Sequence, residues 1–80
     1  MTAGEATRIR ILGLIAEQGI TINKLATRSG ITQSTLNNIT SRRNNSASVS
    51  TIKKLCDGFG ISLRAFFDNE LFENLEQEIK

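Results

Sequence analysis

Apolar residues recur at helical spacing along most of the chain, and no alternating strand pattern persists. Near the start, Ile11, Leu12 and Ile15 form an apolar stripe of this kind. Thr2 and Glu5 have the spacing of a capping box, in which each side chain binds the other residue's backbone N–H. We therefore expect a first helix over about residues 3–18 and an all-α fold.

Three short stretches share one order of residue types: glycine, isoleucine, a hydroxyl residue and, four positions later, a large apolar residue. Glycine ends a helix because it accepts a positive φ, and the hydroxyl residue caps the next helix. The two apolar residues form a hydrophobic staple across the cap. The stretches are Gly19-Ile20-Thr21 with Leu25, Gly30-Ile31-Thr32 with Leu36, and Gly60-Ile61-Ser62 with Phe66.

These starts predict helices at about 22–29, 33–40 and 63–67. A fourth helix is expected between them, from Val49 to about Gly58, with Ser48 as its cap and a polar loop over 41–47 before it. Beyond Asp68, apolar residues at helical spacing predict an additional acidic amphipathic helix over 69–80. Its apolar face packs on the same domain, forms a dimer interface or contacts another protein. That face consists of Leu71, Phe72, Leu75 and Ile79.

Charge is divided unevenly along the chain, although the net charge is only +2. Residues 1–64 contain nine Lys or Arg and three Asp or Glu, whereas residues 65–80 contain one Lys and five acids. Between residues 19 and 54 there are six basic residues and no acid. A block without carboxylates is typical of a surface that binds a polyanion, although a solvated basic face has the same composition.

The composition argues against several classes of function. The chain has no histidine and one cysteine, so we expect no disulfide, no metal site, no cofactor and no enzymatic activity. No apolar run reaches about 18 residues, and the N-terminus lacks the apolar block of a signal peptide. We therefore expect a cytoplasmic protein. We also expect no separate domain that senses a small molecule, because 80 residues form one small domain.

The predicted third helix has one apolar face and one polar face that lacks Glu and Lys. Leu36 and Ile39 point to the core, and the outer face carries amides and a hydroxyl. Gln and Asn can bind adenine N6 and N7 together, so this face suits the edges of DNA bases. Arg42 and Arg43 follow directly and are placed for phosphates. The outer residues are Gln33, Ser34, Asn37 and Asn38.

Two segments, INKLATRSGITQSTLNNI and STIKKLCDGFGISLRAFFD, resemble the phage-repressor-like (Cro/XRE-type) helix-turn-helix family. The resemblance covers about residues 8–68. It implies a five-helix DNA-binding bundle over 1–68, with the helix-turn-helix at about 21–40, that binds a double-stranded DNA operator as a homodimer. It further implies a transcriptional regulator, repressor-like, whose helix 33–40 enters the major groove and reads bases through Gln33, Ser34, Asn37 and Asn38.

Phosphate contacts are expected around this helix, partly from the resemblance and partly from the free N–H groups at the start of the second helix. The chain departs from the family at Ser41-Arg42, where Asn-Gly is frequent, and at Ala47, where proline is frequent. A different class of function, a helical protein-interaction module using the same bundle, is favoured by the acidic tail. The expected phosphate-contacting residues are Thr21, Asn23, Thr35, Arg42, Arg43 and Asn44.

Overall fold

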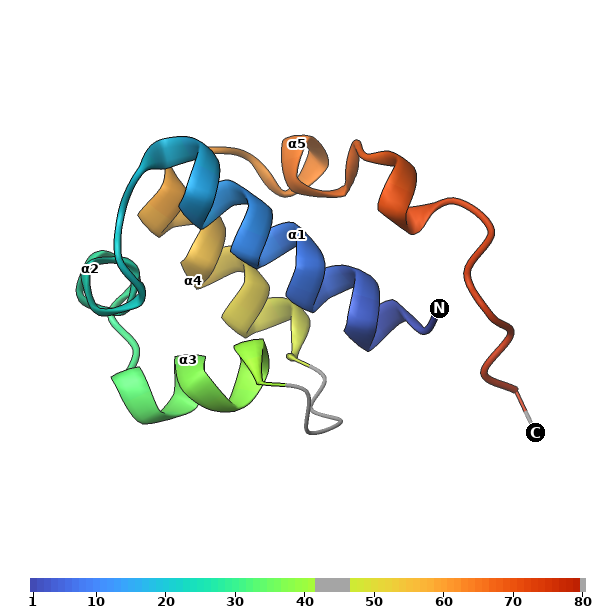
Figure 1. The fold of residues 1–80 in the computed structure, drawn as a ribbon, viewed down its shortest axis with the longest axis horizontal. Coiled ribbons are helices and arrows are strands. Elements are labelled where there is room, and N and C mark those ends of the chain that lie inside the picture. Colours follow the sequence, from blue (N-terminus) through green and yellow to red (C-terminus); the bar gives the residue numbers. More distant parts are fainter. Residues whose placement is uncertain (42–46, 80) are drawn as a thin grey trace.

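The computed structural model describes residues 1–41 and 47–79 and contains five α-helices followed by one 3-10 turn (Figure 1). The described residues include no strand, and the predicted all-α class is confirmed. Four helices have the predicted bounds, and the fourth ends one residue later than expected. The elements are α1 (Ala3–Gln18), α2 (Ile22–Ser29), α3 (Gln33–Thr40), α4 (Val49–Phe59), α5 (Leu63–Phe67) and η1 (Glu70–Phe72).

Helices α2, α3 and α5 each begin as the repeated stretches predict. Gly19, Gly30 and Gly60 have φ values of 64°, 69° and 76°, the left-handed region that glycine adopts without strain. The next hydroxyl residue caps each helix by accepting the backbone N–H three positions on. The isoleucines of the three stretches are half-buried and pack against the core that contains Leu25, Leu36 and Phe66.

The predicted capping box at the start of α1 is present. The Thr2 N–H donates to Glu5 Oε1 at 3.1 Å, and the Glu5 N–H donates to Thr2 Oγ1 at 3.2 Å. Hydrogen bonds from the Thr2 backbone and side chain lower the pKa of the Glu5 carboxyl. Glu5 therefore remains charged at the positive end of the α1 dipole, where a carboxylate is stabilising.

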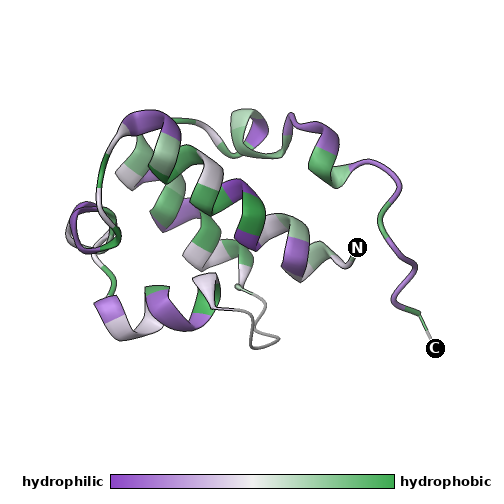
Figure 2. Cartoon of the chain, viewed as in Figure 1, coloured by the Kyte–Doolittle hydropathy of each residue, from purple (hydrophilic) through white to green (hydrophobic). Residues whose placement is uncertain are grey.

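The core contains residues of all five α-helices, and Figure 2 shows hydrophobic residues mixed with hydrophilic ones along α1 and α4. Helices α2 and α4 approach most closely at Gly58, where an added Cβ would lie 2.2 Å from Ser29 Oγ. The Ser29 hydroxyl is buried and has no hydrogen-bond partner among the described residues. The core residues are Ile11, Leu14, Leu25, Ala26, Leu36, Ile39, Ile52, Leu55, Cys56, Phe59 and Phe66.

The prediction of an amphipathic helix over 69–80 is wrong. Only η1 forms, and residues 73–79 are not helical. Asn74 has a φ of 55°, which interrupts any helix, and Glu70, Glu73 and Glu76 would repel one another at a spacing of three residues. A segment of about 12 residues is also too short to be a stable helix without good packing.

The tail instead returns to the N-terminus of its own chain. The Glu76 N–H donates to the Met1 carbonyl at 3.0 Å, and the Met1 ammonium lies 3.2 Å from the Glu76 carboxylate. Phe72 packs against the core, with its ring centroid 6.0 Å from that of Phe66 and 4.9 Å from that of Phe67. Of the other apolar tail residues, Leu71 and Leu75 are half-buried and Ile79 is 83% exposed.

Candidate nucleic-acid interface

Helix α3 is anchored on one side and open on the other. Leu36 and Ile39 are its buried residues, with exposed fractions of 0% and 6%. The four residues predicted to read bases are all exposed, and all lie on this one helix. The helix therefore presents amide and hydroxyl groups to the solvent from a backbone fixed against the core. These residues are Gln33, Ser34, Asn37 and Asn38.

The first turn of α3 is held by a pair of hydroxyl groups. Thr32 Oγ1 accepts the Thr35 N–H at 3.1 Å and donates to Thr35 Oγ1 at 2.8 Å. Thr35 is exposed, and its hydroxyl can donate as well as accept, so it can also bind an outside acceptor such as a phosphate oxygen. Thr35 also occupies the position that Glu5 occupies in α1, and the first turn of α3 contains no acid. The positive end of the α3 dipole is therefore not compensated by a carboxylate.

The last turn of α3 ends without the glycine that is frequent in the family. The Ser41 N–H donates to the Asn37 carbonyl at 2.9 Å, and the Ser41 hydroxyl donates to the Asn38 carbonyl at 3.1 Å. The Thr40 hydroxyl donates to the Leu36 carbonyl at 3.0 Å. The Ser41 N–H and hydroxyl thus satisfy two of the carbonyls that the end of a helix leaves free. No pattern in the sequence predicts this arrangement.

Helix α2 supplies the second group of predicted contacts. Thr21 Oγ1 accepts the Lys24 N–H at 3.0 Å, and Asn23 is exposed in the first turn. This turn also contains no acid. Lys24 and Arg28 are exposed and form no ion pair with any residue of the described ranges. The start of α2 therefore combines free N–H groups with the uncompensated charge of Lys24, the features that bind phosphate.

The other basic residues differ in whether their charge is free to contact a phosphate. Lys53 is paired with Asp57 one turn later on α4, whereas Lys54 has no such partner in the described part of the chain. Arg10 is used internally, because its guanidinium donates to the carbonyls of Phe66 and Ala65 at 2.8 and 3.0 Å. Arg42, Arg43 and Asn44, the remaining predicted phosphate contacts, lie outside the described residues.

Residues 1–41 and 47–79 offer no group of three or more potential metal ligands and no helix long and apolar enough to cross a membrane. Cys56 is fully buried in the core, and this burial raises the pKa of its thiol. A buried, protonated thiol is unreactive, so Cys56 serves as a small core residue.

Comparison with known proteins gives one family and a set of similar structures. The family described as "Helix-turn-helix" matches residues 13–66. The crystal structure of the prophage Lp1 protein 11 is 36% identical, covering 94% of this chain and 99% of that one, with a TM-score of 0.80. The restriction-modification controller protein C.Esp1396I is 20% identical over 85% of this chain and 86% of its own, with a TM-score of 0.74. No curated protein matches the chain.

Proposed function

The chain belongs to the Cro/XRE-type helix-turn-helix family of DNA-binding regulators, and we propose that it binds an operator in double-stranded DNA as a homodimer, with α3 in the major groove. The observation that carries the proposal is the exposed face of α3, which consists of amide and hydroxyl side chains and has no Glu or Lys. A helix that is merely solvated usually carries charged side chains on this face. We propose that the bound protein represses transcription by blocking access to the operator. This role needs no enzymatic activity and is exercised in the cytoplasm.

Direct reading of bases is assigned to the exposed face of α3. Gln33 at the start of the helix and Asn37 one turn later can each donate to and accept from an adenine edge. Ser34 binds a base through its hydroxyl, and Asn38 lies on the same exposed side. These contacts supply the preference for one DNA sequence over another.

Phosphate contacts flank the reading helix and supply most of the affinity. Thr21 and Asn23 at the start of α2 bind one phosphate, and the exposed hydroxyl of Thr35 binds another. Arg42, Arg43 and Asn44 are assigned to the backbone beyond α3. Because each neutralised phosphate releases counterions, binding is expected to weaken steeply as the salt concentration rises.

Substitution of Gln33 by alanine tests the base-reading role. Gln33→Ala is expected to weaken binding to a selected operator by about 1–3 kcal/mol and to leave binding to random DNA nearly unchanged. Gln77→Ala makes the same chemical change on the exposed tail and is expected to affect neither. Fluorescence anisotropy with both duplexes measures the two affinities.

Equal losses on both duplexes would show that Gln33 contacts the backbone and not a base. A wild-type protein that neither binds heparin nor shifts random DNA at low salt would overturn DNA binding altogether. That result would favour the helical protein-interaction module instead.

A further inference from the structure

Helix α1 carries apolar residues on two sides. One side is buried in the bundle, and the other, which we call the α1 outer face, lies opposite the buried residues by the helical period. The α1 outer face consists of Ile9, Leu12, Gly13 and Ala16. Gly13 and Ala16 are exposed, and Ile9 and Leu12 are half-buried. Within the described residues neither Ile9 nor Leu12 packs against the core, so two large apolar side chains remain partly open to the solvent.

The fold of the single chain does not explain why residue 13 is a glycine. Gly13 lies in the interior of α1, where glycine destabilises a helix relative to alanine. Its φ is outside the left-handed region that favours glycine, and a Cβ added to it would meet no atom of the described residues within 4 Å. Alanine would therefore fit and strengthen the helix. A glycine on the outside of a helix instead allows another backbone to approach closely.

A carboxylate stands at each end of the α1 outer face. Glu5 precedes Ile9 by four residues and Glu17 follows Gly13 by four, so the four residues form one row along the helix. Both carboxylates are exposed, and neither forms an ion pair within the described residues. At about 1.5 Å per residue, the two carboxylates are about 18 Å apart along the helix axis.

This arrangement of apolar, small and acidic residues fits one kind of partner. We propose that the α1 outer face binds an amphipathic α-helix of a second protein, which carries Lys or Arg at both ends of its apolar face. The apolar side chains of the partner helix cover Ile9 and Leu12, and its backbone approaches most closely at Gly13. Its basic residues pair with Glu5 and Glu17, which fixes how the two helices align.

The charges distinguish this partner from other occupants of the face. A second copy of the chain would bring carboxylates against carboxylates, because its own α1 outer face also ends in Glu5 and Glu17. The phosphates of DNA and of anionic lipids would meet the same repulsion. Arg8 borders the face four residues before Leu12 and opposes the two carboxylates with a single positive charge. A helix with basic ends is therefore the occupant whose charge complements the face.

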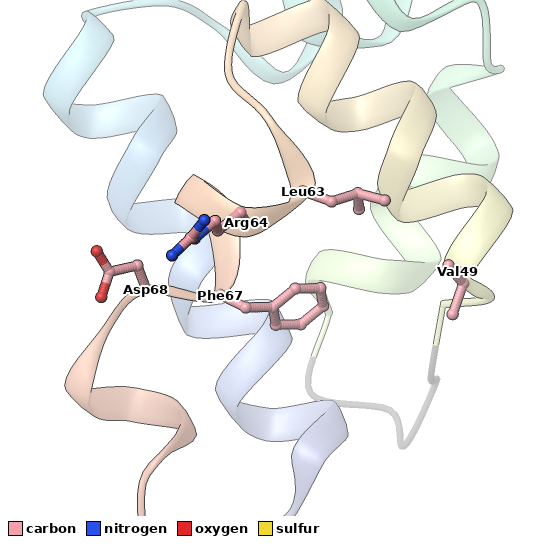
Figure 3. Close-up of a pocket in the computed structure, with 5 residues that line it drawn as sticks. All are labelled: Val49, Leu63, Arg64, Phe67 and Asp68. Carbon is pink, nitrogen blue, oxygen red and sulfur yellow. The ribbon is translucent and has the colours of Figure 1, made fainter.

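The α1 outer face is separate from the other surfaces of the molecule. The proposed DNA contacts lie on α2, α3 and the residues around them. The hollow between α4 and α5, which Val49, Leu63 and Phe67 help to line, also belongs to other elements (Figure 3). Binding at α1 therefore uses no residue assigned to the operator. The inference goes beyond the proposed function, and its test needs no DNA.

Selection from a library of helical peptides tests the proposal on the full chain. The library displays peptides of about 18 residues on yeast, a length that spans both carboxylates. Each peptide has one apolar face, and the residues at the two ends of that face are Lys, Gln or Glu. The peptides enriched on the wild-type protein are expected to carry Lys at both ends. Exchange of both lysines for glutamine should weaken binding about 3–10-fold, measured by fluorescence anisotropy.

The variant Gly13→Leu separates docking from folding. The leucine occupies the space over Gly13, so the affinity for the selected peptide should fall at least about 10-fold. Thermal stability should not fall, because the position is open and leucine favours a helix more than glycine does. Ser50→Leu adds a leucine to an exposed position of α4 and is the matched control, for which unchanged peptide binding is expected.

Charge reversal tests the ends of the face. Glu17→Lys should weaken binding of the selected peptide about 3–10-fold, and a peptide with Glu at the corresponding end should recover it. Glu78→Lys makes the same change on the exposed tail and should have no effect.

Selected peptides that bind Gly13→Leu as tightly as the wild type would dock elsewhere, and this result would overturn the proposal. A selection that yields no binder, or one that does not favour basic ends, would overturn it as well. Failure of the proposed function would be recognised separately, as a wild-type protein that binds the selected peptide and no DNA.

Discussion

Helices α2 and α3 begin in the same way and are used differently. Both have eight residues, follow a left-handed glycine and a half-buried isoleucine, and are capped by threonine. The leucine four residues after each cap is fully buried. Five residues after the cap they diverge, because Ala26 of α2 is buried and Asn37 of α3 is exposed.

This difference shows how one local pattern supports two tasks. Helix α2 buries three residues, the last of them Ser29 in close contact with α4 at Gly58. Helix α3 buries only Leu36 and Ile39, and its residues 33–35, 37 and 38 are exposed. The shared residues thus fix where each helix starts, and the residues that differ decide whether its second face packs or is presented to a ligand.

The largest effects are expected from exchanging the residue types at the position where α2 and α3 differ, Ala26 and Asn37. Ala26→Asn places an amide in the hydrophobic core, where overpacking and an unpaired polar group cost about 1–3 kcal/mol each. Asn37→Ala should leave the free energy of unfolding nearly unchanged and weaken operator binding instead. Urea unfolding and anisotropy measure the two effects. A stability loss from Asn37→Ala as large as that from Ala26→Asn would show that the two helices pack alike.

A smaller effect is expected at the contact between α2 and α4. Gly58→Ala places a Cβ 2.2 Å from Ser29 Oγ and should lower the free energy of unfolding by about 1–3 kcal/mol. The higher helix propensity of alanine should offset up to about 1 kcal/mol of this loss. Gly13→Ala, on a helix with open space around the glycine, should instead gain about 1 kcal/mol.

The serine partner makes this prediction sharper. Ser29→Ala removes the clashing oxygen and a buried hydroxyl without a partner, so it should stabilise the wild type and reduce the cost of Gly58→Ala. The four proteins form a double-mutant cycle that thermal unfolding can measure. Additive effects would contradict a direct contact between the two positions.

Local signals explain why the five helices were predictable from the sequence. Glycine, staple and cap act within about six residues, and the structure has all of them at the predicted places. The exposure of Gln33 and Asn37 follows from the same periodicity that buries Leu36. Helix α3 ends at the predicted residue, but the hydroxyl bonds from Thr40 and Ser41 near its end were not predicted, because no standard motif indicates them.

Distant contacts explain what the sequence did not predict. The spacing of Leu71, Phe72 and Leu75 indicates a helix, but Phe72 packs with Phe66 and Phe67 and the chain then turns at Asn74. Glu76 forms its ion pair with the ammonium group of Met1, at the opposite end of the chain. The hollow between α4 and α5 was not predictable for the same reason, because Val49 and Phe67, which both line it, come together only in the folded protein.

Selection of binding sites from a random duplex pool tests most directly whether α3 reads bases. The wild type should enrich one motif, present as two half-sites about one helical turn apart. The variant Gln33→Ala/Ser34→Ala/Asn37→Ala should keep salt-dependent binding to DNA and enrich no motif. If this variant enriches the same motif as the wild type, the exposed face of α3 does not determine the sequence preference.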